Sequence, residues 1–594
     1  MRTAHVLKPA LAADHRLAAT ALAALMLAFG PRPAGAQWPL FGRAISNPTA
    51  SQLHPDIATD GAGGAVIVWQ DFRTSQPEIA VNHVLATGAL DLNWPHFGRS
   101  VVTDPVAIAD AAGGQSNPVI ASDGAGGAIV AWEDLRSADT EFDIFATHLL
   151  ADGHVDPAWG VNGTAVSVID GAQNAPQIVA DGAGGAIVTW QDSRAGASVE
   201  DVYAQHVLAT GAVDPRWPVN GLAVGAAAGP QELPALSADG AGGAIIAWQD
   251  QRGLPSGFDV FAQHVLNSGV ADPRWPVNGL AVCTANADQG RVTILSDGGT
   301  GAIVAWTDGR FANTDHIFAD HVLASGTVDP AWPVNGRQVS NAAVIESRPR
   351  ATSDGAGGAI VGWQGFTTGL TIFAQHVKAN GVIDPVWPAG GRALSNTAEL
   401  ETKAELAADG AGGAIVTWQD GPRVVAQHVL ANSSFDPAYP ATGLPLADPN
   451  GGQGDPVIVS AGLDGAIASW TDSRDAATTR QDIYAIQVLA AETLGVPDPP
   501  AVTTLRFARP NPNPARDPLT LRYALAREAS VTLAVLDPAG RRVRQLVSGR
   551  ETAGEHAVVW DLRDERGGPV GAGVYFALLE SGGESVIQKV MRVK

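Results

Sequence analysis

Short apolar runs separated by turn-forming residues recur along most of the chain. In residues 175–224 the runs fall at 175–180, 186–190, 201–208 and 222–224, with glycine, proline or aspartate between them. They are rich in β-branched and aromatic residues and lack the 3.6-residue period of a helix, so they predict four short antiparallel strands joined by turns. Their successive positions are apolar, which is typical of strands packed against neighbours on both faces.

This four-strand unit is copied along the chain. The Gly-rich turn between its first and second strands starts at Asp60, Asp123, Asp181, Asp239, Asp297, Asp354 and Asp409, and in a degraded form at Ala461. The tryptophan that ends each second strand is Trp69, Trp132, Trp190, Trp248, Trp306, Trp363, Trp418 or Trp470. Their spacing begins at 63 residues, settles at 58 and shortens to 52. Such a period predicts one supersecondary unit copied eight times.

The two ends of the repeat array are complementary. Residues 38–46 read as a fourth strand with no first three before it, and the last copy ends at its third strand, residues 482–489. If the N-terminal strand completes the last sheet, the ring closes and leaves only short, protected edges. We therefore predict an all-β fold whose residues 37–495 form an eight-bladed β-propeller closed by the N-terminal strand. The alternative is an open solenoid, which would not need complementary ends.

The first 36 residues are typical of a signal peptide. Arg2, Lys8 and Arg16 precede the apolar run 17–29, and residues 34–36 offer a small-x-small cleavage site. The run is short for a membrane span, and no other segment has 18 apolar residues. We expect an exported protein, extracellular or on the outer cell surface, with no transmembrane span in the mature chain. Cys283 is the only cysteine, so no disulfide can form within the chain.

Charge differs between the two parts of the chain. Residues 37–497 hold 19 Lys and Arg against 48 Asp and Glu, a net charge of −29, whereas residues 498–594 hold 14 against 11, a net charge of +3. The acidic part argues against nucleic acid as a partner, because it would repel phosphates. The same charge is also explained by solubility alone.

A second domain is predicted after a Pro-rich linker at residues 496–504. Its expected strands are 505–508, 519–525, 530–537, 541–547, 556–562, 573–580 and 585–593. Seven strands in about 90 residues fit a small immunoglobulin-like β-sandwich.

The repeat resembles that of sialidase-like (BNR-type) bacterial propeller proteins. The matching residues in the second copy are 129–136, Ile-Val-Ala-Trp-Glu-Asp-Leu-Arg, followed by 143–146, Asp-Ile-Phe-Ala. This resemblance implies a propeller but not catalysis, since an Arg-Ile-Pro motif does not occur in the sequence. The repeat itself explains Tyr203, Tyr439 and Tyr484, which leaves no tyrosine over for a sialidase nucleophile.

Residues 505–594 resemble the immunoglobulin-like domain of flagellar hook-capping (FlgD-like) proteins and the C-terminal sorting domains of type IX secretion. The resemblance is carried by residues 510–512, 535–543, 553–556, 560–561 and 571–576 and by the basic end of the chain. It implies a secretion or sorting machinery as the partner of this domain.

Two polar features recur in nearly every copy. Asp-x-Arg follows the second strand at residues 71–73, 134–136, 192–194, 250–252, 308–310 and 472–474. One position of the third strand is His83, His148, His206, His264, His321, His376 or His428. An anion-binding ring or a metal site is conceivable, but residues present in every blade usually serve the fold. We expect Arg to reach the acid that opens the third strand, and the histidines to be hydrogen-bonded inside the protein.

No catalytic, cofactor or metal site is predicted. The Gly-rich turn joins two strands and lacks Gly-Lys-Ser/Thr, so it is not a phosphate loop. It offers one carboxylate per copy, which is too few for calcium.

Antiparallel blades place the Gly-rich and Trp-Pro turns on one face, here called the turn face, and the remaining connections on the other, the loop face. The turn face is nearly uniform, whereas the loops vary, and variable loops on a rigid scaffold usually carry binding. We expect binding at aromatic residues of the loop face, namely Phe142, Phe258, Phe311 and Phe366. The sequence therefore favours a non-catalytic binding or structural surface module with an extracellular glycan or protein ligand. The alternative is an extracellular glycan-acting hydrolase.

Overall fold

The computed structural model consists of two compact units, Met1–Ala491 and Glu492–Lys594. It describes residues 38–593 except 40, 47–49, 95–105, 110, 112, 138–140, 197–198, 253–256, 312–313, 342–344, 367–368, 396, 398, 449–450, 463–464, 475–480, 490–505, 508–509, 511–514, 517, 526–528, 539, 552–553 and 582–583. The predicted signal peptide and the Pro-rich linker lie outside these residues.

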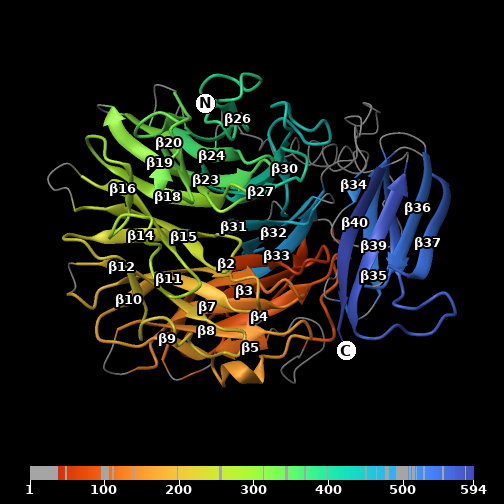
Figure 1. Ribbon diagram of the computed structural model, residues 1–594. Helices are drawn as coiled ribbons and strands as arrows, with labels where there is room; N and C mark the ends of the chain where they lie inside the picture. Colours follow the sequence, from red (N-terminus) through yellow and green to blue (C-terminus); the bar gives the residue numbers. More distant parts are fainter. Residues whose placement is uncertain are drawn as a thin grey trace, which may run out of the picture. The chain divides into compact units, whose positions relative to one another are not determined.

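The first unit is a ring of antiparallel sheets, and the predicted all-β propeller is confirmed. Its described strands form eight sheets, seven of four strands and one of five. The sheets follow one another around the ring in the order of the sequence, so the red N-terminal strands lie beside the blue-green β31 to β33 (Figure 1).

In seven sheets the strands follow one another outwards from the centre in chain order, and in the last sheet the N-terminal strand β1 takes the outermost position. The first, innermost strands are β2 (Gln52–Thr59), β6 (Gln115–Ser122), β10 (Gln173–Ala180), β14 (Gln231–Ala238), β18 (Gln289–Ser296), β23 (Glu346–Ser353), β27 (Glu401–Ala408) and β31 (Gln453–Ser460). The second strands are β3 (Ala65–Asp71), β7 (Ala128–Asp134), β11 (Ala186–Asp192), β15 (Ala244–Asp250), β19 (Ala302–Phe311), β24 (Ala359–Phe366), β28 (Ala414–Asp420) and β32 (Ala466–Asp472).

The outer half of each sheet is less regular. The third strands are β4 (Glu78–Val84), β8 (Asp143–Leu149), β12 (Asp201–Val207), β16 (Asp259–Val265), β20 (Thr314–Leu323), β25 (Leu370–Val377), β29 (Arg423–Val429) and β33 (Asp482–Val488). The fourth strands are β5 (Val106–Ala109), β9 (Thr164–Ser167), β13 (Leu222–Gly225), β17 (Leu280–Cys283), β22 (Arg337–Gln338), β26 (Arg392–Ala393), β30 (Leu444–Pro445) and β1 (Arg43–Ala44). The extra strand β21 (Thr327–Val328) pairs with β20, and Pro157–Trp159 form one 3-10 turn, η1.

The core lies between neighbouring sheets, which explains why the second strands are apolar on both faces. All seven residues of β15 are buried, for example. Trp248 of β15 packs with Val202 and Ala204 of the preceding blade. Each large side chain that is fully buried contributes about 1.5–3 kcal/mol. Eight such inter-sheet clusters therefore hold the ring together.

The predicted closure by the N-terminal strand is confirmed. Strand β1 pairs antiparallel with β33, with Arg43 opposite Ala485 and Ala44 opposite Tyr484. Trp38 donates from its indole N–H to the carbonyl oxygen of Ala86, 3.1 Å away, and so ties the last blade to the first. Trp38 and Ile45 are buried in the cluster between these two blades.

The second unit is a small β-sandwich with the predicted strands. One sheet has the order β34 (Arg506–Phe507), β35 (Leu519–Leu525) and β38 (Gly554–Trp560), and the other β37 (Arg542–Glu551), β36 (Ala529–Leu536), β39 (Gly573–Ser581) and β40 (Glu584–Arg592). The two sheets enclose one core around Tyr523, Leu533 and Trp560.

No helix in the described part of the chain is long and apolar enough to cross a membrane.

Candidate ligand-binding recess

Every first strand is bent at its third residue. These residues are His54, Asn117, Ala175, Leu233, Arg291, Arg348, Lys403 and Asp455, and all have a positive φ between 48° and 56°. The ladder to the second strand shifts register at the same place in all eight sheets, as in a β-bulge. Such a φ costs about 1–2 kcal/mol for a residue with a β-carbon, so the fold must hold it in place.

Side chains of the preceding blade hold three of these bends. The backbone N–H of Ala175 donates to Glu133 Oε1 at 2.8 Å, and that of Leu233 donates to Gln191 Oε1 at 2.8 Å. Arg291 N–H donates to the equivalent Gln249 Oε1 at 3.2 Å. The bend is therefore part of the repeated scaffold, although the side chain that it presents differs from blade to blade.

The bends surround a cavity of about 1170 Å³ at the centre of the ring. It is lined by the third and fifth residues of all eight first strands, together with Glu133, Phe142 and Gln364. The third residues lie near the start of each first strand, where the chain enters from the loop face. We call this cavity the recess, and it opens among groups that differ in every blade.

The basic residues of the recess gather on three neighbouring strands. They are Arg291 on β18, Arg348 and Arg350 on β23 and Lys403 on β27. Arg350 donates to Glu405 Oε1 at 2.8 Å, and Lys403 pairs with Asp455. Arg291 and Arg348 are exposed, and neither forms an ion pair with any described residue.

Two further acids of the recess are held by hydrogen bonds. Glu133 accepts from Asn117 Nδ2 at 2.8 Å as well as from the backbone of Ala175. Asp56 accepts from the backbone N–H groups of Ile57 and Ile120. Burial raises the pKa of Asp56 to about 7 against these two hydrogen bonds, and the charge of Glu405 adds to the rise. Asp56 therefore carries a proton for part of the time at neutral pH.

The four predicted aromatic residues lie in two different settings. Phe311 and Phe366 are 42% and 52% exposed, whereas Phe142 and Phe258 are half-buried. Phe142 lines the recess. Phe366 follows the recess residue Gln364 by two positions on β24, so both side chains lie on one face of the strand, about 7 Å apart along it. A ligand role for these four residues stays a prediction.

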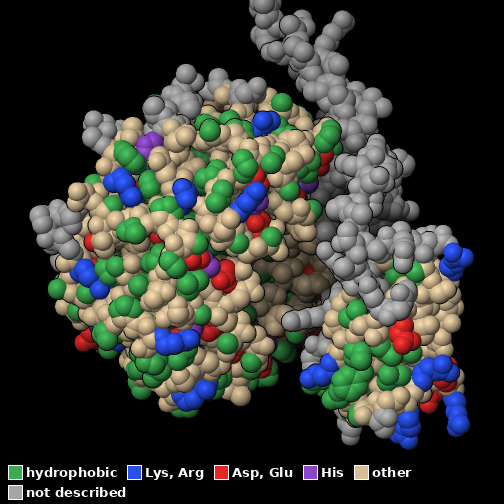
Figure 2. Space-filling model, turned by 45° about the horizontal axis from the view of Figure 1, so that its top comes forward, with side chains coloured by type: hydrophobic (Ala, Val, Ile, Leu, Met, Phe, Trp, Pro, Cys, Tyr) green, Lys and Arg blue, Asp and Glu red, His purple; other side chains and the backbone are tan. Residues whose placement is uncertain are grey.

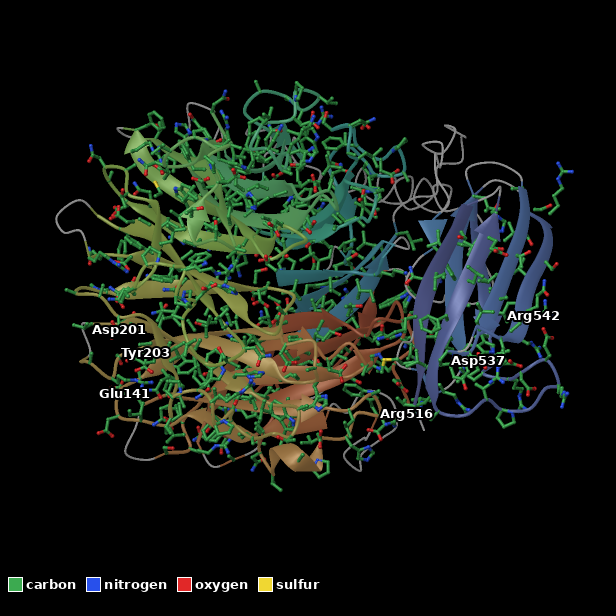
Figure 3. The ribbon with its side chains drawn as sticks, in the orientation of Figure 1. Glu141, Asp201, Tyr203, Arg516, Asp537 and Arg542 are labelled. Atoms are coloured by element: carbon green, nitrogen blue, oxygen red, sulfur yellow. The ribbon has the colours of Figure 1, made fainter. Side chains whose placement is uncertain are left out.

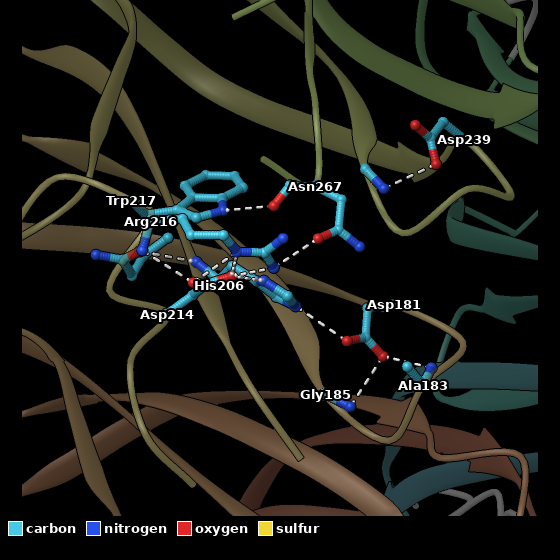
Figure 4. Close-up of polar contacts among 11 residues, drawn as sticks. Asp181, Ala183, Gly185, His206, Asp214, Arg216, Trp217, Asp239 and Asn267 are labelled. Atoms are coloured by element: carbon cyan, nitrogen blue, oxygen red, sulfur yellow. Dashed lines mark hydrogen bonds and ion pairs between the residues drawn. The ribbon is translucent and has the colours of Figure 1, made fainter. Parts of the chain in front are cut away.

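The recurring histidines are structural, as expected. In the third blade, His206 lies between two carboxylates, with Nε2 2.9 Å from Asp181 and Nδ1 2.9 Å from Asp214 (Figure 4). Asp181 also accepts from the backbone of Ala183 and Gly185 in the Gly-rich turn. The cluster thus joins both turns of the turn face to the third strand. The same Asp–His–Asp contacts occur at His83, His148, His264, His321, His376 and His428.

The titration of these clusters follows from their charges. Burial alone would lower the pKa of His428, but its hydrogen bonds to Asp409 and Asp436 raise it to about 9. Burial opposes ionisation of Asp409 as well, yet the bond from His428 and two turn N–H groups hold its pKa below the usual value. The hydrogen bonds to two carboxylates therefore favour a charged imidazolium at His428, and they raise the pKa of His148 in the same way.

Asp-x-Arg is also structural, but its partner differs from the one expected. Arg194 pairs with Asp192, two residues earlier, at 2.5 Å, and not with Asp201 at the start of β12. Its guanidinium lies 3.8 Å from the ring centroid of Tyr203, which is close to Asp201 in Figure 3. Planar stacking and a fork of donors suit arginine to both contacts. Burial and the charge of Asp192 raise the pKa of Asp201 to about 6.

No described group of three or more His, Cys, Asp or Glu side chains is arranged to hold a metal ion. On the propeller surface seen in Figure 2, basic and acidic side chains are scattered among neutral and apolar atoms.

Sequence reasoning overlooked the recess. It compared loops between strands, whereas the variable side chains lie inside the first strands. The signal was present, since the first residue of these strands is always Gln or Glu, while the third residue is of seven kinds among the eight strands, with only Arg occurring twice.

Comparisons with known proteins agree with these two units. Residues 514–581 match the FlgD Ig-like domain family. No curated protein matches the sequence. Among solved structures, the β-propeller domain of the trilobed protease from Pyrococcus furiosus is 7% identical, with a TM-score of 0.38, and the match covers 69% of this chain and 98% of that one.

Two carbohydrate-active enzymes are also similar. The Hadza microbial sialidase is 12% identical, with a TM-score of 0.31 and coverage of 61% of this chain and 77% of that one. The α-L-arabinanase of Penicillium chrysogenum is 12% identical, with a TM-score of 0.32 and coverage of 57% and 98%. The chain thus combines a β-propeller with a C-terminal β-sandwich whose residues 514–581 match the FlgD Ig-like domain family.

Proposed function

We propose that the protein is an exported, non-catalytic binding module that takes an extracellular glycan or protein ligand at the recess. One observation carries this proposal: eight equivalent positions on a repeated scaffold hold seven kinds of side chain around a single cavity, and only arginine occurs twice. A residue that the fold requires is repeated in every blade. A single ligand makes a different contact with each blade, so the residues that contact it differ. A cavity of this size exceeds the usual range for small ligands, so a polymer end or an oligosaccharide fits better.

The exposed aromatic residues extend the proposed site over the loop face. Phe311 and Phe366 belong to the fifth and sixth blades, which also supply Arg291 and Arg348. Rigid aromatic side chains are common binding anchors because they lose little conformational entropy. A ligand that enters the recess between these blades would lie against them.

Binding can be tested with the full chain on arrays of extracellular glycans and matrix proteins. For any ligand found, the double change Leu233→Ala with Phe366→Ala should weaken binding about tenfold or more. The matched control is Val161→Ala with Val219→Ala, which removes apolar side chains that are 91% and 87% exposed on turns outside the recess. Loss of binding in the control alone would refute the site.

Export is part of the same proposal. It is supported by the signal-peptide pattern of residues 1–36 and by the match of residues 514–581 to the FlgD Ig-like domain. We expect a chain that ends at Val496 to keep a folded propeller but to be retained before the outer surface. Normal arrival of the shortened chain at the surface would refute a sorting role for the second unit.

Glycan hydrolysis is the second candidate, and Asp56 is the observation that favours it. A carboxyl group whose pKa is about 7 shares the recess with Glu405, as a general acid and a base would. If this candidate holds, Asp56→Asn should abolish release of reducing ends from a bound glycan while binding persists. Equal release by the variant would exclude it.

A further inference from the structure

Two arginines of the recess have no ion-pair partner among the described residues. Asp455 pairs with Lys403 and Glu405 pairs with Arg350, so these four groups compensate one another. Glu133 is held by hydrogen bonds to Asn117 and Ala175 on the opposite side of the ring order, in blades two and three. Asp56 accepts hydrogen bonds from the backbone of Ile57 and Ile120. The two cations of the recess without an ion-pair partner among the described residues are Arg291 and Arg348, on the neighbouring first strands β18 and β23.

These two arginines differ from those that serve the fold. Arg136, Arg252 and Arg310 each pair with the Asp two residues earlier, and their side chains are only 19–22% exposed. Arg291 and Arg348 are exposed, and no described acid forms an ion pair with either. Both occupy the strained third position, where the backbone directs them to the recess. Arg291 meets the charge of Asp315 without an ion pair, and Arg348 has no ion-pair partner among the described residues.

We propose that the recess binds an anionic polysaccharide, whose carboxylate or sulfate groups are taken by Arg291 and Arg348. This inference rests on the proposed binding function and names its ligand class. A guanidinium offers a planar fork of donors that matches the two oxygens of a carboxylate or sulfate. Because the arginines belong to neighbouring blades, they can receive successive charges of one polymer.

The part of the recess beside the arginines, in blades three and four, suits the uncharged faces of sugar rings. Blades three and four contribute Ala175, Pro176, Leu233 and Pro234, none of which carries a charge. Leu233 is 45% exposed there. A polymer held by its anionic groups at blades five and six would therefore place apolar ring faces of the next sugars over blades three and four.

The test uses isothermal titration of the full chain with two matched pairs of polymers. Polygalacturonate is compared with its fully methyl-esterified form, and dextran sulfate with dextran, so the two arms separate carboxylate from sulfate recognition. We expect at least one anionic polymer to bind about tenfold or more tightly than its neutral partner. The affinity should fall as salt rises from about 0.05 M to about 0.5 M, because screening weakens exposed charge pairs.

The double change Arg291→Gln with Arg348→Gln should reduce that affinity about tenfold or more. Both side chains are exposed and the backbone bond from Arg291 to Gln249 is retained, so thermal unfolding should not change. The control is Lys378→Gln, a cation of the turn face that is 43% exposed. Equal binding of charged and neutral polymers overturns the inference but leaves the binding function. Anionic binding that survives the double change, or that needs Lys378, overturns it too.

Discussion

The turn face and the recess of the propeller differ in what the blades have in common. At the turn face, seven blades repeat one buried Asp–His–Asp cluster with nearly the same distances. At the recess, the backbone bend is repeated eight times, but the side chain at the bend is of seven kinds, and only the arginine of blades five and six is shared. Repetition of chemistry marks what the fold needs, and repetition of backbone with changing chemistry marks where a ligand is met.

Energetics explain why the turn face and the recess differ. A buried carboxylate that loses its histidine partner carries a large penalty, so seven blades keep both partners, while Gln487 occupies the histidine position in the eighth. An exposed side chain at the bend can be exchanged at almost no cost in stability. The turn face is thus constrained blade by blade, whereas the recess is free to become asymmetric.

The largest expected effect comes from opening the ring, on which both regions depend. A chain that starts at Asn47 lacks β1 and the buried side chains of Trp38 and Ile45. Loss of two such side chains should cost about 3–6 kcal/mol and expose β33 as an unpaired edge. We expect a lower unfolding temperature and aggregation, measured by calorimetry and light scattering. An unchanged melt would contradict closure by the N-terminal strand.

Removing one turn-face histidine should have the next largest effect. His206→Ala leaves Asp181 and Asp214 without their shared partner, and a broken buried pair costs about 3–5 kcal/mol. Urea unfolding should report most of this loss. His154→Ala is the control, because the His154 side chain is 66% exposed and its loss should change stability by less than about 0.5 kcal/mol. Similar losses of unfolding free energy in His206→Ala and His154→Ala would contradict a special structural role for the turn-face histidines.

The turn-face clusters also predict a pH dependence. A histidine with a raised pKa stabilises the fold fully below about 6.5 and less as pH rises through its folded value, about 9 for His428. The raised pKa values of Asp56 and Asp201 act in the same direction between about pH 4 and pH 7. The lowered pKa of Asp409 acts only in acid, where stability is lost as pH falls.

We therefore expect a higher unfolding temperature at about pH 5.5 than at about pH 9. His428→Gln provides the control, since Gln487 occupies the equivalent position of β33 in the last blade. Its alkaline decline should be shallower than that of the unchanged chain. A melting temperature that rises from pH 5.5 to pH 9 would contradict the charged clusters.

The smallest effect concerns backbone strain at the recess. Leu233 has a φ of 51°, so Leu233→Gly should relieve strain and raise stability by up to about 1 kcal/mol. Ala235→Gly is the matched change two residues later, where the strand pairs regularly with Ala247, and it should lower stability by about 0.5–1 kcal/mol. If urea unfolding showed that both changes raise stability, or that both lower it, strain at the bend would be contradicted.

The architecture could be predicted from the sequence because each blade repeats the same short apolar strands and the same turn residues. The Gly-rich turns predicted the hairpins between first and second strands. The unmatched strand at residues 38–46 predicted that the N-terminus closes the ring, as the pairing of β1 with β33 does. The structural role of the histidines followed from their number alone. The partner of Arg194 was wrong because ion-pair choice depends on side-chain geometry, which places Asp192 nearer than Asp201.

The recess could not be derived in the same way. A positive φ is expected of glycine or asparagine, and nothing local in Leu233 or Arg291 indicates one. The bend arises from the packing of neighbouring blades, through contacts such as that from Leu233 to Gln191. A comparison of the eight copies position by position would have shown that the third residue of the first strand varies. It would not have shown that these residues surround one cavity.

The most direct test measures binding and stability on the same two variants. For a ligand of the full chain, Arg291→Gln with Arg348→Gln should weaken binding about tenfold or more and leave urea unfolding unchanged. His206→Ala should lower the free energy of unfolding by about 3 kcal/mol and leave the affinity of the folded protein unchanged. If the recess variant lost stability but not binding, or the turn-face variant lost binding while folded, the division between scaffold and site would be contradicted.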